Sequence, residues 1–173
     1  MFKKTLLFGL PILLILIIVY YYLGGFNKTL VELVQTDDYV IAGYEYYGPY
    51  DQDELQELFF QVQDFVESGA LVGTITVVNY QLDFEVQDSV RQLIGVQVKT
   101  QPLTLPDKVI MDTIRSEQVV RATVKAHPLV MPHPGDTQAQ IMDYAKKEFL
   151  ELDNLVIEQY KGEEEIWVDV PVR

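Results

Sequence analysis

The sequence contains no cysteine among its 173 residues. Disulfide bonds, thiolate catalysis and cysteine-ligated zinc are therefore excluded. The two histidines, His127 and His133, flank a proline-rich segment without a third ligand at a suitable spacing, so no metal and no cofactor are expected. The sequence also lacks a glycine-rich phosphate loop and a serine in a nucleophile-elbow motif. These absences favour a binding module over an enzyme.

Basic residues are scarce. The chain has 13 Lys and Arg against 26 Asp and Glu, which gives a formal net charge of −13. Such a surface repels the phosphates of nucleic acids and attracts cations, so no nucleic-acid partner is expected. The simpler interpretation, that the charge only keeps a domain soluble, accounts for the composition equally well.

Charged residues are missing altogether from Thr5 to Leu23, where Leu, Ile, Val and Phe dominate. A helix of this length spans about 28 Å, close to the hydrocarbon thickness of a bilayer. Lys3 and Lys4 precede the stretch and tyrosines close it, so it predicts an uncleaved transmembrane anchor in residues 5–23, with a cleaved signal peptide as the alternative. The positive-inside rule then gives a single-pass membrane protein with a cytoplasmic N-terminus and an extracytoplasmic domain.

The expected organisation is an anchor in residues 1–25, a juxtamembrane linker in residues 26–37 and one domain in residues 38–173. Within the domain, the same order of strand and helix patterns occurs twice. The expected strands cover residues 40–47, 74–80, 90–99, 118–126, 155–160 and 165–172, and the expected helices begin at Asp51 and Asp136. The predicted fold is therefore α+β, with two βαββ repeats, pseudo-twofold symmetry, both helices on one face and a groove on the other.

Several short motifs of the domain resemble the GyrI-like (gyrase-inhibitory-protein-like) small-molecule-binding domain. They are Tyr47-Gly48-Pro49-Tyr50, Leu105-Pro106 and the terminal Val168-Asp169-Val170-Pro171-Val172. The resemblance covers roughly residues 38–173 and implies an effector-binding fold with a groove for a lipophilic, often cationic, small molecule. In this family, aromatic side chains line the groove and a carboxylate anchors the ligand. Some members are hydrolases and others are interaction modules.

The candidate ligand-binding residues are aromatic and acidic side chains of the two repeats. They are Tyr44, Tyr46, Tyr50, Glu165, Trp167 and Asp169. Each aromatic face attracts a cation by about 0.5–2 kcal/mol, although core packing explains the same tyrosines. Glu45 alternates with Tyr44 and Tyr46 along one strand, so either the glutamate or the tyrosines face the groove.

The last strand departs from the family pattern. The position four residues before Pro171 is often glutamate in the family and is Trp167 here. Asp169 or Glu165 would have to replace the missing carboxylate, because both share one strand face with Trp167. The sequence thus predicts a membrane-anchored GyrI-like domain that binds a small lipophilic molecule, with a cation as the expected charge type. A membrane-tethered adaptor for a protein partner and a hydrolase of small electrophilic compounds are the alternatives.

Overall fold

The structure is a computed structural model that describes residues 2–49, 51–81, 89–99 and 104–173, with side chains from residue 11 onward. The elements are α1 (Phe2–Tyr22), β1 (Leu30–Gln35), β2 (Tyr39–Gly48), α2 (Gln52–Glu67), β3 (Gly73–Asn79), β4 (Val90–Val98), β5 (Ile110–Ile114), β6 (Gln118–Lys125), the short 3₁₀ helix η1 (Pro128–Val130), α3 (Pro134–Glu148), β7 (Val156–Tyr160) and β8 (Glu165–Pro171).

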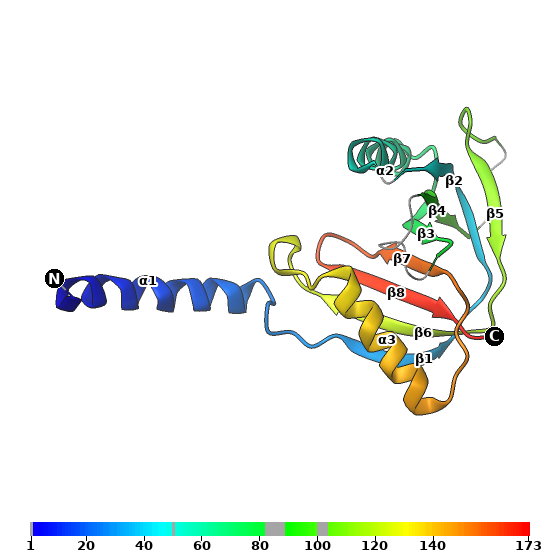
Figure 1. Cartoon of the computed structure of the whole chain (residues 1–173). Coiled ribbons are helices and arrows are strands. Elements are labelled where there is room, and N and C mark those ends of the chain that lie inside the picture. Colours follow the sequence, from blue (N-terminus) through cyan, green and yellow to red (C-terminus); the bar gives the residue numbers. More distant parts are fainter. Residues whose placement is uncertain (1, 50, 82–88, 100–103) are drawn as a thin grey trace.

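The eight strands form one antiparallel sheet in the order β1-β6-β8-β7-β3-β4-β2-β5 (Figure 1). The first unit, β2-α2-β3-β4, and the second unit, β6-α3-β7-β8, have the same order of elements and meet where β3 pairs with β7. The predicted α+β fold with two βαββ repeats is therefore confirmed.

The outermost strands are exchanged between the two units. β1 precedes β2 in the chain but pairs with β6, whereas β5 precedes β6 but pairs with β2. Each unit is thus extended at its edge by the strand that leads into the other unit. The sequence patterns predicted neither strand: β1 lies in the expected linker of residues 26–37, and β5 lies in the connection between the repeats.

Helices α2 and α3 cover the same face of the sheet. Val62 of α2 packs in one apolar cluster with Val77 of β3, and Ile141 of α3 packs in another with Val156 of β7. Val77 pairs with Glu158, which is two residues from Val156, so all these strand residues point to one side. The opposite face, called the cavity face below, carries its own apolar cluster from β2 to β7.

The helix ends follow local capping chemistry. Asp51 caps α2 as predicted, and its side chain accepts a hydrogen bond from the backbone N–H of Glu54 at 3.2 Å. Gly69 follows the helix with a φ of +75°, a conformation that suits glycine. Helix α3 begins at Pro134, two residues earlier than predicted, because His133 serves as its N-cap.

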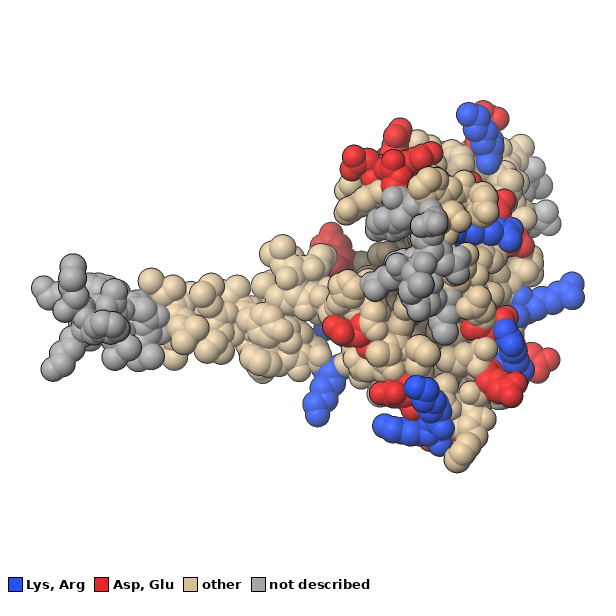
Figure 2. All heavy atoms as spheres, viewed as in Figure 1, with Lys and Arg blue, Asp and Glu red and all other residues tan. Residues whose placement is uncertain are grey.

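Helix α1 projects from one end of the sheet as an arm (Figure 1). The described part of this arm carries no charged side chain, whereas both charge signs are scattered over the sheet domain (Figure 2). Two hydrogen bonds fix its base. The backbone N–H of His127 donates to the carbonyl of Leu23 at 2.9 Å, and the Asn27 amide donates to the carbonyl of Lys125 at 2.7 Å.

The predicted membrane anchor is contradicted. Over the described residues, no helix is both long and apolar enough to cross a membrane. This finding overturns the transmembrane helix of residues 5–23, the single-pass membrane localisation and the extracytoplasmic placement of the domain.

Candidate functional site

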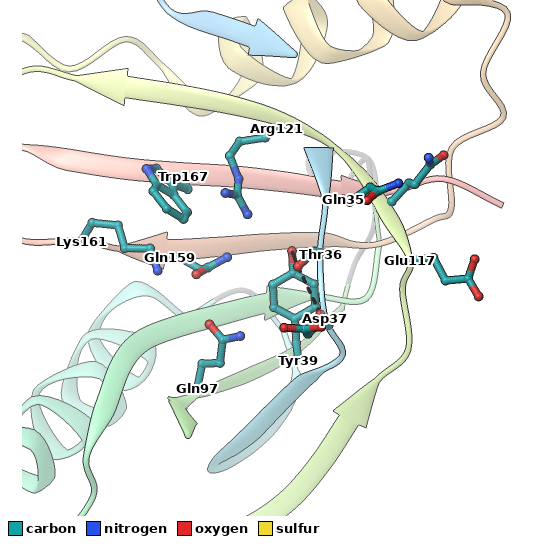
Figure 3. A pocket seen from close by; sticks show the side chains of 11 residues that line it. Gln35, Thr36, Asp37, Tyr39, Gln97, Glu117, Arg121, Gln159, Lys161 and Trp167 are labelled. Carbon is teal, nitrogen blue, oxygen red and sulfur yellow. Dashed lines mark hydrogen bonds between the residues drawn. The ribbon is translucent and has the colours of Figure 1, made fainter. Parts of the chain in front are cut away.

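A cavity of about 620 Å³ opens on the cavity face, between the two units (Figure 3). The lining residues are Gln35, Thr36, Asp37, Tyr39, Gln97, Glu117, Gln118, Arg121, Gln159, Lys161 and Trp167. They come from both units and from the two connections that lead out of the exchanged strands β1 and β5. The volume lies within the range of small-molecule sites, so this cavity is the candidate functional site.

The register of the sheet gathers the polar side chains of the cavity. Arg121 of β6 is the pairing partner of Asp169 of β8, and Gln159 of β7 is the partner of Trp167. Paired residues of antiparallel strands point to the same side of the sheet, and so do residues two apart on one strand. These four side chains therefore form one continuous patch.

Asp169 is the buried centre of this patch, with no exposed side-chain surface. Its carboxylate accepts two hydrogen bonds from Arg121, at 2.7 Å from Nε and 2.8 Å from Nη2. The Tyr39 hydroxyl donates at 2.7 Å and the Gln159 amide at 2.9 Å. Three of these four bonds end on Oδ2 and one on Oδ1, and the carboxylate has no exposed surface for a ligand to contact. The bonds join β2 of the first unit to three strands of the second.

The hydroxyl of Tyr39 keeps its proton in this network. Burial, together with the negative charge of Asp169, raises the pKa of Tyr39 well above its ordinary value. Tyr39 therefore acts as a permanent donor to Asp169, and its oxygen also accepts a bond of 3.3 Å from Thr36. The connection between β1 and β2 is thereby tied to the base of the cavity.

The indole of Trp167 lies between two cations of the protein itself (Figure 3). The guanidinium carbon of Arg121 is 4.0 Å from the ring centroid, and the ammonium of Lys161 is 4.2 Å from it. The indole N–H donates to Glu165 at 2.6 Å. Glu165 also pairs with Lys125 at 3.1 Å, and these two contacts lower the pKa of the Glu165 carboxyl.

The side chain of Lys161 is partly buried, and its ammonium makes no hydrogen bond or ion pair with the described part of the chain. Burial, followed by the nearby charge of Arg121, lowers the pKa of its ammonium. The two acids of the lining, Asp37 and Glu117, are exposed. Glu117 points away from Arg121 and Lys161 (Figure 3). Among the described residues, the charge of Arg121 is paired with Asp169 and the ammonium of Lys161 has no ion-pair partner, although the chain as a whole is acidic.

Three predicted site residues come together on the cavity face. Trp167 lines the cavity, Asp169 lies behind it, and Glu165 lies at its side through the bond to the indole N–H. Their predicted contact with a ligand stays a prediction, but the partners of Asp169 show it to be an internal support of the site.

The other predicted residues lie elsewhere. Tyr44 and Tyr46 belong to the cluster beneath α2, on the face opposite the cavity, so they cannot contact a ligand there. Tyr44 packs against Phe65 with the ring centroids 5.9 Å apart. Glu45 points to the cavity side of β2 and pairs with Arg91 at 2.7 Å, as strand alternation requires. Tyr50 lies outside the described residues.

The sequence patterns missed Arg121, Lys161, Gln159 and Tyr39. One signal was available for the first of these. Arg121 interrupts the apolar run Val119-Val120-Arg121-Ala122-Thr123, just as Asp169 interrupts the run at the end of the chain. Opposite charges at the centre of two otherwise apolar strands indicate a buried ion pair between them.

A second carboxylate, Glu158 of β7, lies on the face covered by the helices. It accepts long hydrogen bonds from the Asn79 amide at 3.3 Å and the Tyr160 hydroxyl at 3.4 Å. Burial raises the pKa of the Glu158 carboxyl, and the bond from Tyr160 opposes this only in part. Glu158 is thus costly to ionise in the folded protein.

We expect Glu158→Gln to raise the free energy of unfolding at pH 7 and to have little effect below about pH 4. A raised pKa means that the folded state holds the proton more tightly than the unfolded state, so ionisation destabilises the wild type as the pH rises above the ordinary glutamate pKa. Urea denaturation at both pH values measures the difference. Glu57→Gln, at an exposed position of α2, is the control. An equal effect of Glu158→Gln at both pH values would show that folding does not raise the pKa of the Glu158 carboxyl.

Comparison with known proteins identifies the fold alone. No protein-family model matches the sequence, and no curated protein matches it. Among solved structures, SAV2435 bound to tetraphenylphosphonium is 12% identical with a TM-score of 0.54, and the match covers 83% of this chain and 94% of that one. EcmrR in its complex with DNA is 12% identical with a TM-score of 0.63, covering 99% of this chain and 68% of EcmrR.

A hydrolase encoded by lin2189 from Listeria innocua has the same fold. It is 12% identical with a TM-score of 0.53, and the match covers 89% of this chain and 98% of the hydrolase. The fold is therefore shared by a ligand-bound protein, a DNA-bound protein and a hydrolase. These likenesses are consistent with the GyrI-like small-molecule-binding fold expected from the sequence. Because one fold can serve several functions, the chemistry of this chain has to be inferred from its own site residues.

Proposed function

We propose that this protein binds a small molecule in the cavity between its two units. The observation that carries the proposal is the cavity itself, which places polar groups of Lys161, Arg121 and Gln97, without hydrogen-bond partners among the described residues, around one half-buried indole. Arg121 and its neighbours are fixed by the buried Asp169, so the site is formed before a ligand arrives. The structural likeness to SAV2435 bound to tetraphenylphosphonium supports a ligand site in this fold.

A lipophilic cation, the ligand type expected from the family resemblance, meets two obstacles in this cavity. The indole of Trp167 already lies between Arg121 and Lys161, so an incoming cation would have to displace one of them and meet the charge of the other. Asp169, the buried carboxylate, already accepts four hydrogen bonds. The proposal is therefore for small-molecule binding, without the cationic preference.

The test uses the full chain and a panel of positively charged, neutral and negatively charged small aromatic compounds. Trp167 is the one tryptophan of the sequence, so its indole N–H gives a single NMR resonance that reports on the cavity. At least one compound should shift this resonance with saturation, and Gln97→Phe should abolish the shift by filling the cavity.

Gln56→Phe, which adds the same ring on the exposed surface of α2, should leave binding unchanged. Thermal unfolding of both variants shows whether each is folded. A panel with no saturable shift, or binding that survives Gln97→Phe in a folded protein, would refute the proposal.

A further inference from the structure

We infer that the ligand of this cavity is an anion, a small organic molecule whose carboxylate or phosphate group binds between Lys161 and Arg121. The inference rests on the proposed function, because it assigns the charge of the ligand in that same cavity. It reverses the cationic preference that the acidic composition of the chain suggested.

The first argument is the state of Lys161. Its ammonium carries three donors, and among the described residues its one specific contact is the ring of Trp167. Partial burial costs this ammonium some of its hydration, and no acceptor among the described residues replaces it. An oxyanion in the cavity would supply both the acceptor and the opposite charge.

The second argument is the geometry of Arg121. Asp169 binds Nε and Nη2 and holds the guanidinium in place, and the whole side chain is only 12% exposed. The Nη1 group makes no hydrogen bond to the described part of the chain, and it is not among the buried unpaired atoms. Because Arg121 lines the cavity, Nη1 is the group of the guanidinium that remains for a ligand. A fixed guanidinium suits carboxylate and phosphate oxygens in particular.

The third argument is the balance of charge inside the cavity. Arg121 and Asp169 neutralise each other, which leaves the charge of Lys161 uncompensated. Lys99 adds to it: together with burial and Arg121, its charge lowers the pKa of Lys161, although Asp169 and Glu165 act in the opposite direction. The acidic lining residues Asp37 and Glu117 are exposed, so they leave the interior positive.

Four compounds of nearly equal shape test the charge of the ligand. They are benzoate and phenyl phosphate, which are anions, benzamide, which is neutral, and benzamidine, which is a cation. Binding to the full chain is measured by the Trp167 indole resonance and by calorimetry. We expect at least one anion to bind about tenfold or more tightly than benzamidine, because hydrogen bonds between charged partners are the stronger ones. The ratio of benzoate to phenyl phosphate distinguishes a carboxylate site from a phosphate site.

Variants of Lys161 then test whether its ammonium binds the anion. Lys161→Met should weaken the preferred anion about tenfold while leaving benzamide unchanged, and Lys161→Arg should retain the preference for anions. Lys147→Met, on the exposed surface of α3, is the matched control and should change nothing. Thermal unfolding confirms that each variant is folded.

Three results would overturn the inference. If benzamidine or benzamide binds more tightly than both anions and Gln97→Phe abolishes that binding, the cavity binds small molecules but does not select anions. If Lys161→Met leaves the anion affinity intact, Lys161 does not bind the anion and the inference fails. If none of the four compounds binds at millimolar concentration, the anion inference fails, and only failure of the wider panel as well refutes the proposed function.

Discussion

Asp169→Asn is expected to lower the free energy of unfolding by about 3–5 kcal/mol. The substitution removes the charge that compensates Arg121, whose side chain is only 12% exposed, and disturbs the acceptor shared by Tyr39 and Gln159. Because these partners lie on β6, β2 and β7, the loss should loosen the contact between the two units. Urea denaturation at neutral pH measures the effect.

Glu45→Gln is the matched control for this prediction. Glu45 and Arg91 are also 2.7 Å apart, but their side chains are 39% and 49% exposed. An exposed pair contributes at most about 1 kcal/mol, so this variant should remain close to the wild type. The double variant Asp169→Leu with Arg121→Met should recover much of the lost stability, because it removes both buried charges. Equal losses of stability for Asp169→Asn and Glu45→Gln would show that burial does not increase the contribution of the Arg121–Asp169 ion pair.

The second large effect is expected at the glycine pair of β2 and β4. Gly43 and Gly95 are pairing partners, and each lacks room for a side chain. A Cβ atom on Gly95 would overlap the carbonyl oxygen of Ala42, and one on Gly43 would overlap that of Ile94. Gly95→Ala should therefore lower the free energy of unfolding by about 2–3 kcal/mol, because two backbones must move apart.

Gly135→Ala provides a control in which the same methyl group should do no harm. Gly135 lies in the first turn of α3, and the nearest atoms to an added Cβ belong to the side chain of His133. Alanine favours a helix over glycine, so stability should be unchanged or slightly higher. Chemical denaturation measures the free energy of unfolding of both variants. If Gly95→Ala were as stable as the wild type, the close approach of β2 and β4 would not be tight.

The repeated order of elements could be predicted because each central element has a strong local pattern. The capping residue Asp51 and the alternation around Val96 and Val168 identify helix and strand without tertiary information. The edge strands β1 and β5 are short and mostly exposed or half-buried, so little apolar contrast marks them. Their exchange between units depends on contacts far apart in the chain.

The site was harder to predict than the fold. In β2 both faces are buried, with Ile41 on one side and Ala42 on the other, so alternation could not show which face Tyr44 and Tyr46 occupy. Packing against α2 places both tyrosines on the face that the helices cover. The charge of the cavity was also hidden, because Arg121 and Asp169 are 48 residues apart and become partners only through the register of β6 and β8. Trp167 and Asp169 were predicted together because they share one face of one strand.

The exchange of β1 and β5 also determines where the chain can be divided. A fragment that starts at residue 38, the domain boundary expected from the sequence, would lack β1 and leave unpaired the backbone groups along that edge of β6. Unpaired edges of this kind recruit strands from other molecules and promote aggregation. Because β1 must reach from residue 30 to residue 123 to find its partner, neither half of the sheet is complete until both have folded.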